Sequence, residues 1–402
     1  MHAQQALDRE KASYARVEPP CPVFGTCGGC ALQDLAYPDQ LALKRARLAA
    51  VLAALGDMPP VELIPLEEPW RYRNKAELTF GQSPDGTLRL GYHAAGSFWR
   101  VVDIDDCLLL PDAVIPCVRE VRALASRSGL PPYYPKTHQG FFRHLLVRSS
   151  QATGHILLAL ITAPGHREAI EAISREVMAR HPAVTSFSWG ITRKRADIAV
   201  PDELIPLGGQ PLLEDRIGAF RLFVHPLSFL QPSGVQADRI YAHLCQALAA
   251  AAGGVAWDLY CGLGVIGFYL ARQMRRVYAV DIERHQIELA RRNAADNGLP
   301  NIEYRVGAVE TLLLDRRFWL QEAKPDVVVV DPPRAGLHPR VIASLLAAKP
   351  AHLAYLSCNA QSLVRDLTAL LSGFPRYRIA ELIAFDMFPQ TNHVETLAVL
   401  QR

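Results

Sequence analysis

The stretch Asp258-Leu-Tyr-Cys-Gly-Leu-Gly-Val-Ile-Gly267 decides the fold, because it has the pattern of a glycine loop between a strand and a helix. The apolar run VAWDLY (255–260) leads into it and is typical of a buried strand. Gly262 and Gly264 can adopt backbone angles that other residues resist, and they let the main chain approach a ligand closely. The stretch therefore predicts a ligand-binding loop at the end of a strand.

A carboxylate follows at the spacing that a ribose would need. The next strand-like run, RVYAVD (276–281), ends in Asp281, 19 residues after Gly262. An acidic residue at this place suits the two hydroxyl groups of a ribose. The loop thus predicts a ribose-bearing cofactor, but by itself it does not distinguish a nicotinamide cofactor from S-adenosylmethionine.

The chain divides into two parts with different sequence patterns. After about residue 225, helical stretches alternate with strand-like runs such as DVVVVD (326–331) and LAYLSC (353–358), which predicts a mostly parallel α/β sheet. Before it, short apolar runs such as GHILLALIT (154–162) and ADIAV (196–200) alternate with turn residues and predict a strand-rich region. We expect domains at 1–225 and 226–402, with a helix over 39–56 whose Leu41, Leu48, Val51, Leu52 and Leu55 share one side.

Composition sets the broad class. Half of the 402 residues are hydrophobic, so a sizeable core is expected, and the net charge of +3 neither requires nor excludes a nucleic-acid partner. No apolar run approaches the roughly 20 residues that span a bilayer, and the start, MHAQQALDREKAS, lacks a signal-peptide core. We expect a cytoplasmic monomer without membrane contact, in which clustered cysteines serve metal binding or catalysis rather than disulfides.

Three chemically useful side chains fall at predicted strand ends. Asp331 ends one very apolar strand and Cys358 ends the next, which puts both on the edge where open α/β sheets bind ligands. Glu395 opens the last apolar strand, where a carboxylate facing the same edge could act as a base. The plain alternatives are that Cys358 is a small buried hydrophobe and Glu395 a solvated residue; the polar neighbours of Cys358 favour a functional role.

Together these groups suit one specific reaction. Carbon 5 of uracil is a poor nucleophile, and a thiolate that adds to carbon 6 creates an enolate in which carbon 5 can attack a methyl group. A base must then remove the proton from carbon 5 so that the thiol can leave. The scheme requires a cysteine, a base and a methyl donor, and the sequence offers a candidate for each.

The motifs DLYCGLG (258–264), DPPRAGL (331–337), LSCNAQ (356–361) and MFPQTNHVE (387–395), in this order, resemble the RNA uracil-5-methyltransferase family. That family modifies transfer RNA or the large ribosomal RNA. The resemblance implies a Rossmann-like S-adenosylmethionine-dependent methyltransferase domain in which Cys358 is the nucleophile and Glu395 is the base. LSFLQPSG (227–234) resembles the stretch whose glutamine contacts the cofactor. The resemblance implies cofactor-contacting roles for Gln231, Tyr260, Asp281 and Asp331, alongside Gly262 and Gly264 in the loop, and places Phe229 near the target base.

A second cysteine pattern lies near the start of the chain. Cys21, Cys27 and Cys30 are spaced C-x5-C-x2-C in a glycine-containing stretch, and an all-cysteine site needs a fourth ligand, for which Cys107 and Cys117 are candidates. The residues alone leave an iron–sulfur cluster and zinc open, although the single short knuckle favours the cluster.

This pattern resembles that of the ribosomal branch of the family, which holds a [4Fe–4S] cluster on a C-x5-C-x2-C stretch and a distant cysteine. CPVFGTCGGC (21–30) and DIDDC (103–107) carry the resemblance, which implies that Cys21, Cys27, Cys30 and Cys107 hold the cluster in an N-terminal iron–sulfur and RNA-binding domain. Cys117, Cys245 and Cys261 are expected to be packing residues. Because only 20 residues precede Cys21, we expect the short ribosomal form, which lacks a small β-barrel domain. The 23S ribosomal RNA is then the first substrate candidate and transfer RNA the alternative.

Basic and aromatic residues mark possible RNA contacts. They interleave in Trp70–Lys75, and further basic groups are Arg193–Arg195 and the pair Arg143 and Arg148, although a solvated surface explains any one of them equally well. We expect the target base to be flipped out of its stack to reach Cys358. The competing hypotheses are an iron–sulfur oxidoreductase with a nicotinamide cofactor, in which LSCNAQ and MFPQTNHVE have no role, and a non-catalytic RNA-binding protein.

Overall fold

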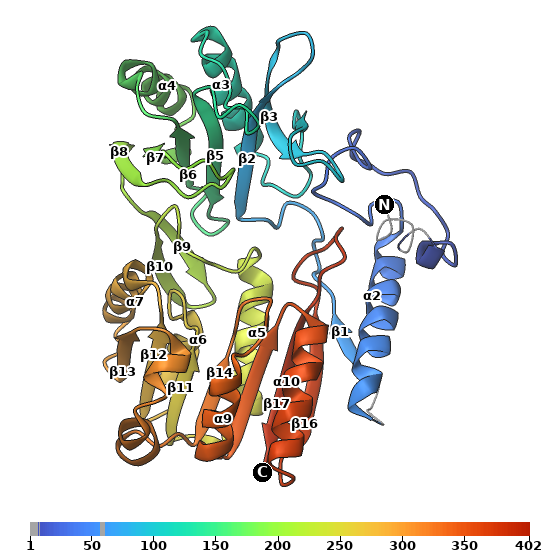
Figure 1. Ribbon diagram of the computed structural model, residues 1–402, viewed down its shortest axis with the longest axis vertical. Helices are drawn as coiled ribbons and strands as arrows, with labels where there is room; N and C mark the ends of the chain where they lie inside the picture. The colour runs from blue at the N-terminus through green and yellow to red at the C-terminus, as the bar shows by residue number, and fades with distance from the viewer. Residues whose placement is uncertain (1–6, 8, 57–60) are drawn as a thin grey trace.

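The computed structural model describes residues 7, 9–56 and 61–402, whose two large sheets lie one above the other along the long axis of the molecule (Figure 1). Most of the polar start of the chain, residues 1–6 and 8, lies outside the described residues. The lower sheet has eight strands in the order β1-β16-β17-β15-β14-β11-β12-β13. Their bounds are β1 Glu62–Ile64, β11 Val255–Leu259, β12 Arg276–Asp281, β13 Ile302–Val306, β14 Val327–Val330, β15 His352–Ser357, β16 Arg378–Phe385 and β17 Glu395–Gln401.

All neighbouring strands of this sheet run parallel except β17, which is antiparallel to both β15 and β16. The four valines of β14 are fully buried because helices cover both faces, as the unbroken apolar run predicts. One face packs against α5 (Gly234–Ala247), α6 (Val265–Ala271) and α7 (Arg284–Asp296). The other packs against α8 (Val309–Leu312), α9 (Pro339–Ala348) and α10 (Ala360–Gly373). The mostly parallel sheet is confirmed, and the reversed last strand is an addition that the sequence pattern did not reveal.

The upper sheet has seven strands in the order β4-β3-β2-β5-β6-β7-β8 (Figure 1). Their bounds are β2 Lys75–Gln82, β3 Leu88–His93, β4 Val101–Asp103, β5 Phe142–Ser149, β6 Ile156–Thr162, β7 Val184–Ile191 and β8 Glu203–Gly209. Helices α3 (Val114–Arg127) and α4 (Arg167–Arg180) bury one face of it. The strand-rich region is therefore confirmed. ADIAV (196–200) is an exception, because it forms no strand and leaves Ile198 and Val200 exposed.

A segment from the start of the chain is built into the lower body. Helix α2 (Tyr37–Leu52), followed by a short 3-10 turn (Ala53–Leu55), matches the predicted helix, and its Leu48 and Leu52 pack with Leu63 and Ala384. β1 then pairs with β16 as the edge strand of the lower sheet. The hairpin of β9 (Leu213–Ile217) and β10 (Phe220–Val224) also packs into the lower core. The limits 1–225 and 226–402 stay a prediction, to which the structure adds this crossing of the chain.

Within the described residues, no helix combines the length and the apolar character needed to cross a membrane.

Candidate active site

The glycine loop lies between β11 and α6 and is shaped by three residues with positive φ. Tyr260 has φ +66°, Gly262 +53° and Gly264 +78°. A Cβ on Gly264 would lie 2.8 Å from the Tyr304 hydroxyl oxygen, so glycine is required there for space as well as for angle. A non-glycine residue such as Tyr260 adopts such an angle only where its surroundings enforce it, which is typical of functional sites.

Two aspartates hold this loop in place by accepting hydrogen bonds from its backbone N–H groups. The Gly262 N–H donates to Asp281 Oδ2 at 2.8 Å, and the Glu283 N–H donates to Asp281 Oδ1 at 2.9 Å. Asp258 is fully buried and accepts from the Gly267 N–H at 2.9 Å, and burial raises its pKa to about 8. Sequence reasoning did not single out Asp258, although it opens the DLYCGLG motif. Both aspartates fix the loop, and Asp281 keeps lone pairs for ligand hydroxyl groups.

The segment before α5 contributes the next wall of the site. The Phe229 N–H donates to Gln286 Oε1 at 3.0 Å, which ties the segment to α7 beside Gly262. The Phe229 ring is 59% exposed, whereas Gln231 is buried and its side chain hydrogen-bonds to Asp331. The predicted cofactor residues Gln231 and Asp331 are therefore in direct contact.

The buried Glu395 and the half-buried Asp331 form a pair of neighbouring carboxyl groups. Burial raises the pKa of Asp331 to about 7, although the Gln231 hydrogen bond opposes the shift. Burial and the neighbouring Asp331 raise the pKa of Glu395 well above its usual range, and the Glu395 residue is only 2% exposed. Two carboxyl groups that resist joint ionisation are a suitable partner for a cationic ligand, which relieves their repulsion. This pair of carboxyl groups thus fits a sulfonium cofactor.

Cys358 faces Glu395 because of the strand register. Ser357 pairs with Thr396 across the antiparallel β15 and β17, so the next residue on each strand end places Cys358 opposite Glu395. Burial, followed by the charges of Glu395 and Asp331, raises the pKa of the Cys358 thiol, while a hydrogen bond from Arg334 lowers it. Arg334 lies in the DPPRAGL motif, but sequence reasoning gave it no role.

Cys358 opens into a pocket whose far wall is helix α2. The lining residues are mostly polar or basic and come from α2, the DPPR loop, the start of α10 and the β16–β17 loop: Lys44, Arg47, Leu48, Val51, Arg334, Cys358, Asn359, Ala360, Gln361, Asn392, His393, Val394 and Thr396. The sequence reasoning treated α2 only as an amphipathic helix. Its contribution to this pocket depends on tertiary packing, for which the local sequence carries no signal.

The loop that leads to Glu395 is anchored by the N-terminal segment. The backbone N–H groups of Ala31 and Leu32 donate to the Gln390 carbonyl oxygen at 2.8 and 3.1 Å. Gln40 Nε2 donates to Gln390 Oε1 at 2.8 Å, and Lys44 Nζ donates to Asp386 Oδ1 at 2.6 Å and to the Phe388 carbonyl at 2.9 Å. Hydrogen bonds therefore connect the segment that carries the cysteines to the loop before the candidate base, Glu395.

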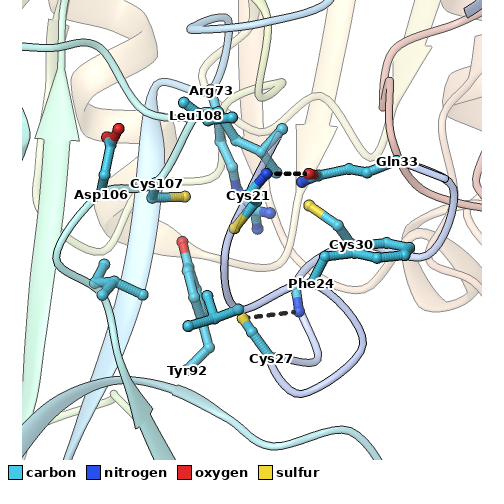
Figure 2. A pocket seen from close by; sticks show the side chains of 14 residues that line it. Cys21, Phe24, Cys27, Cys30, Gln33, Arg73, Tyr92, Asp106, Cys107 and Leu108 are labelled. Atoms are coloured by element: carbon cyan, nitrogen blue, oxygen red, sulfur yellow. Dashed lines mark hydrogen bonds between the residues drawn. The ribbon is translucent and has the colours of Figure 1, made fainter. Parts of the chain in front are cut away.

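The four predicted metal ligands line one cavity. Cys21, Cys27 and Cys30 come from the N-terminal loop and Cys107 from the segment after β4, and Figure 2 shows their sulfur atoms around a common space. Burial raises the pKa of Cys30 to about 12. Burial also raises the pKa values of the Cys27 and Cys107 thiols, and the nearby Arg73 cation opposes part of this rise. Among the described residues, no group of three or more His, Cys, Asp or Glu side chains is placed to hold a metal ion.

The remaining cysteines lie elsewhere. Cys117 is buried in the core of the upper body, and its thiol donates to the Ala113 carbonyl at 3.3 Å. Cys261 is buried in the lower core, against which Cys245 packs. Of the two candidates for a fourth ligand, the structure thus brings only Cys107 to the cysteine cavity.

Two of the three predicted RNA-contact groups are largely structural. Arg148 is 1% exposed and donates from Nε to the Pro226 carbonyl at 2.8 Å, and Arg143 is 2% exposed and donates to the Ala196 carbonyl at 2.6 Å. The prediction that these two arginines contact RNA is wrong, because both are used to hold loops. In Trp70–Lys75, Tyr72 and Asn74 are buried and bond to the Pro389 and Gln231 carbonyls. Arg193–Arg195 lies on the surface, as expected.

Comparison with known proteins agrees with this site. The family model described as tRNA (Uracil-5-)-methyltransferase matches residues 213–402. An RNA methyltransferase of Halalkalibacterium halodurans is 34% identical over 99% of this chain and 86% of its own length. One of Listeria innocua is 35% identical over 98% of this chain and 86% of its own length.

A solved structure extends the similarity to the whole fold. The Pyrococcus abyssi tRNA (uracil-54, C5)-methyltransferase, in complex with S-adenosyl-L-homocysteine, superposes with a TM-score of 0.77 at 28% identity, covering 96% of this chain and 85% of that one. The mixed α/β methyltransferase fold is thereby confirmed. The oxidoreductase and non-catalytic alternatives are set aside. The chain belongs to the RNA uracil-5-methyltransferase family, and it is an RNA (uracil-5-)-methyltransferase.

Proposed function

We propose that the enzyme transfers a methyl group from S-adenosylmethionine to carbon 5 of one uridine in RNA, through a covalent bond between Cys358 and carbon 6. The observation that carries the proposal is the placement of Cys358 opposite Glu395 at two adjacent antiparallel strand ends, beside Asp331. We assign cofactor contacts to Gln231, Tyr260, Gly262, Gly264, Asp281 and Asp331, which all lie at this edge of the sheet.

The chain's own groups supply the other steps. Arg334 hydrogen-bonds to the Cys358 sulfur and so favours the thiolate, which adds to carbon 6 of the uracil. The electrons move into carbon 5, where bound S-adenosylmethionine would supply the methyl group, its sulfonium–methyl bond breaking to leave neutral S-adenosylhomocysteine. Glu395 then takes the proton from carbon 5, and the Cys358 thiolate leaves as the ring double bond re-forms. A buried carboxylate with a raised pKa is a stronger proton acceptor than a solvated one.

The RNA substrate has two candidates. The cysteine motifs resemble those of the ribosomal branch and favour 23S ribosomal RNA. The superposition on a tRNA (uracil-54, C5)-methyltransferase favours transfer RNA. Digestion of both RNA fractions from cells with and without the gene, followed by mass spectrometry of 5-methyluridine, decides between them. In either RNA the target base would flip out toward Cys358, and we place the enzyme in the cytoplasm as a monomer.

We further propose that Cys21, Cys27, Cys30 and Cys107 hold a [4Fe–4S] cluster, for which their thiols would have to move from the positions that they have among the described residues. The proposal is supported by four thiols around one cavity, three of them in the loop that leads to Ala31 and Leu32, whose N–H groups bond to Gln390. In that place the cluster would act as a structural staple for the segment that holds the loop before Glu395. Anaerobic preparations are expected to be brown and to contain iron and sulfide, and stoichiometric zinc without iron would refute the assignment.

Glu395→Gln and Cys358→Ala test the mechanism as a pair. Glu395→Gln keeps the nucleophile but loses the base, so a protein–RNA adduct that survives denaturation should accumulate. Cys358→Ala should form no adduct and no 5-methyluridine. Normal methylation by Cys358→Ala would end the covalent mechanism, whatever the result for Glu395→Gln.

A further inference from the structure

An unusual surface lies on three loops of the upper body: residues 94–100, 133–138 and 192–200, here called the three-loop surface. Half of the ten large hydrophobic side chains that are exposed in the described part of the chain lie on it. They are Phe98 (84% exposed), Trp99 (56%), Tyr134 (42%), Ile198 (44%) and Val200 (47%). Exposed apolar residues gathered in this way mark an interaction site more often than singly scattered ones do.

Direct contacts make the three loops neighbours. Lys136 Nζ lies 4.6 Å from the centre of the Trp99 ring, which joins the first two loops. The Tyr133 hydroxyl donates to the Arg195 carbonyl at 3.3 Å, which joins the second and third. The buried Arg143 reinforces this joint, because its guanidinium stacks 3.9 Å from the Tyr133 ring centre and donates to the Ala196 carbonyl. The arginine that was expected to contact RNA thus supports the surface from behind.

Among the described residues, the charged groups of the three-loop surface that lack an ion-pair partner are cations. Arg193 pairs with Glu203, and Lys194 pairs with Asp202, so these two cations are offset. Arg100, Lys136 and Arg195 form no ion pair with any residue that the structure describes. Asp197 is turned inward, where it contacts His144 Nε2 at 3.1 Å and His93 Nε2 at 3.7 Å. Unpaired cations beside flat aromatic rings suit a polyanion with stacking bases rather than an apolar protein partner.

Packing joins the three-loop surface to the segment that carries Phe229. Ala199 of the third loop is buried in a cluster with Ala159 and Ile161, against which Leu227 packs. Leu227 lies two residues before Phe229, whose ring is exposed and whose backbone N–H is bonded to Gln286 beside Gly262. The third loop is therefore connected through Leu227 to the segment that carries Phe229.

We propose that the three-loop surface binds unpaired bases of the RNA substrate next to the target uridine, with Phe98 and Trp99 as stacking platforms and Arg100, Lys136 and Arg195 as phosphate contacts. The proposal rests on the proposed function and names the structural class of its substrate, an RNA segment that is single-stranded at the site. RNA-binding proteins recognise such segments by stacking side chains on the unpaired bases. A base-paired helix hides its base faces and offers these rings nothing to stack on.

The first experiment measures binding without catalysis. A fluorescent 20-nucleotide oligouridine is titrated into the full-length protein, the Phe98→Ala/Trp99→Ala variant and the matched control Leu314→Ala, which removes another exposed apolar side chain from a different part of the surface. The double Ala variant should bind about 10-fold or more weakly, from the usual contribution of one to two stacked bases. Leu314→Ala should bind normally, and Phe98→Tyr/Trp99→Tyr should retain most of the affinity because tyrosine still stacks.

Tryptophan fluorescence supplies a second readout. Trp99 is far more exposed than Trp189, Trp257 and Trp319, so oligouridine should quench its emission, and the quenching should be lost in Trp99→Phe. A fully paired RNA duplex of equal length should bind all variants alike. Equal oligouridine affinity of the wild type and the double Ala variant, or equal losses for the duplex, would overturn the proposal.

The outcomes separate this proposal from the proposed function. If the enzyme forms 5-methyluridine and the double Ala variant leaves KM for RNA unchanged, the three-loop surface is not an RNA site and the methylation proposal stands. If oligouridine binding depends on Trp99 but no 5-methyluridine forms in any RNA, the surface stands and the proposed reaction fails. In both cases binding of S-adenosylmethionine, measured by calorimetry, should be the same for the double Ala variant and the wild type.

Discussion

Replacement of the buried Lys44 by methionine should be among the most damaging single changes outside the reacting groups. Lys44 Nζ donates to Asp386 Oδ1 at 2.6 Å and to the Phe388 carbonyl at 2.9 Å, and the side chains of Lys44 and Asp386 are at most 1% exposed. Burial lowers the pKa of Lys44, whereas Asp386 raises it. Methionine keeps the apolar stem and loses only the charge and its hydrogen bonds.

The magnitude follows from what is left behind. In Lys44→Met, Asp386 keeps one side-chain partner among the described residues, the Tyr37 hydroxyl at 3.0 Å. Removing one partner of a buried ion pair costs about 3–5 kcal/mol, because the other charge stays buried without compensation. The matched control is Arg47→Met on the same helix, whose partner Glu10 is partly exposed. A surface pair of that kind is worth about 0–1 kcal/mol.

Urea unfolding of the three proteins, followed by circular dichroism, measures the difference. The double variant Lys44→Met/Asp386→Leu should recover part of the loss, because it removes both charges. A second consequence concerns catalysis: Lys44 and Gln40 hold the loop that ends at Glu395, so kcat should fall with little change in KM for S-adenosylmethionine. If Lys44→Met unfolds at the same urea concentration as Arg47→Met, the reasoning about the buried charge is refuted.

Four further predictions test the site and the cysteine cavity. Because burial raises the pKa of Asp331 to about 7, raising the pH through this value ionises it and should tighten binding of cationic S-adenosylmethionine in calorimetry; Asp331→Asn should bind weakly at every pH, and equal pH profiles would contradict the assignment. The raised pKa of Asp331 means that the folded state keeps this proton at a pH at which the unfolded state has lost it. Asp331 therefore stabilises the fold at low pH, and this contribution is lost as the pH rises through about 7. In thermal unfolding, Asp331→Asn should lose less stability over this pH rise than the wild type. Arg334→Met removes the hydrogen bond that lowers the Cys358 pKa, so alkylation of Cys358 by iodoacetamide, followed by peptide mass spectrometry, should require a higher pH than in the wild type. Cys107→Ser should lose iron from anaerobic preparations, whereas Cys117→Ser, in the core of the upper body, should retain it.

Several features of the protein were determined by local sequence alone. The valine run of β14, the glycines 262 and 264 and the helix that begins near Tyr37 follow from burial, backbone freedom and periodicity, which act over a few residues. The placement of Cys358 and Asp331 on one edge also followed, because consecutive parallel strands end on the same side of a sheet.

Other features were decided by packing between distant segments. The reversal of β17 places Glu395 against Cys358, and no periodicity distinguishes a parallel strand from an antiparallel one. Arg143 and Arg148 have the composition of surface cations, but loop carbonyls 51 to 80 residues away satisfy them in the interior. ADIAV has the composition of a strand and lies exposed, because Ala199 is the residue of that run that finds apolar partners in the described structure. Sequence specifies which groups are present and their local shape, whereas their burial and their partners depend on which remote segments meet them in the fold.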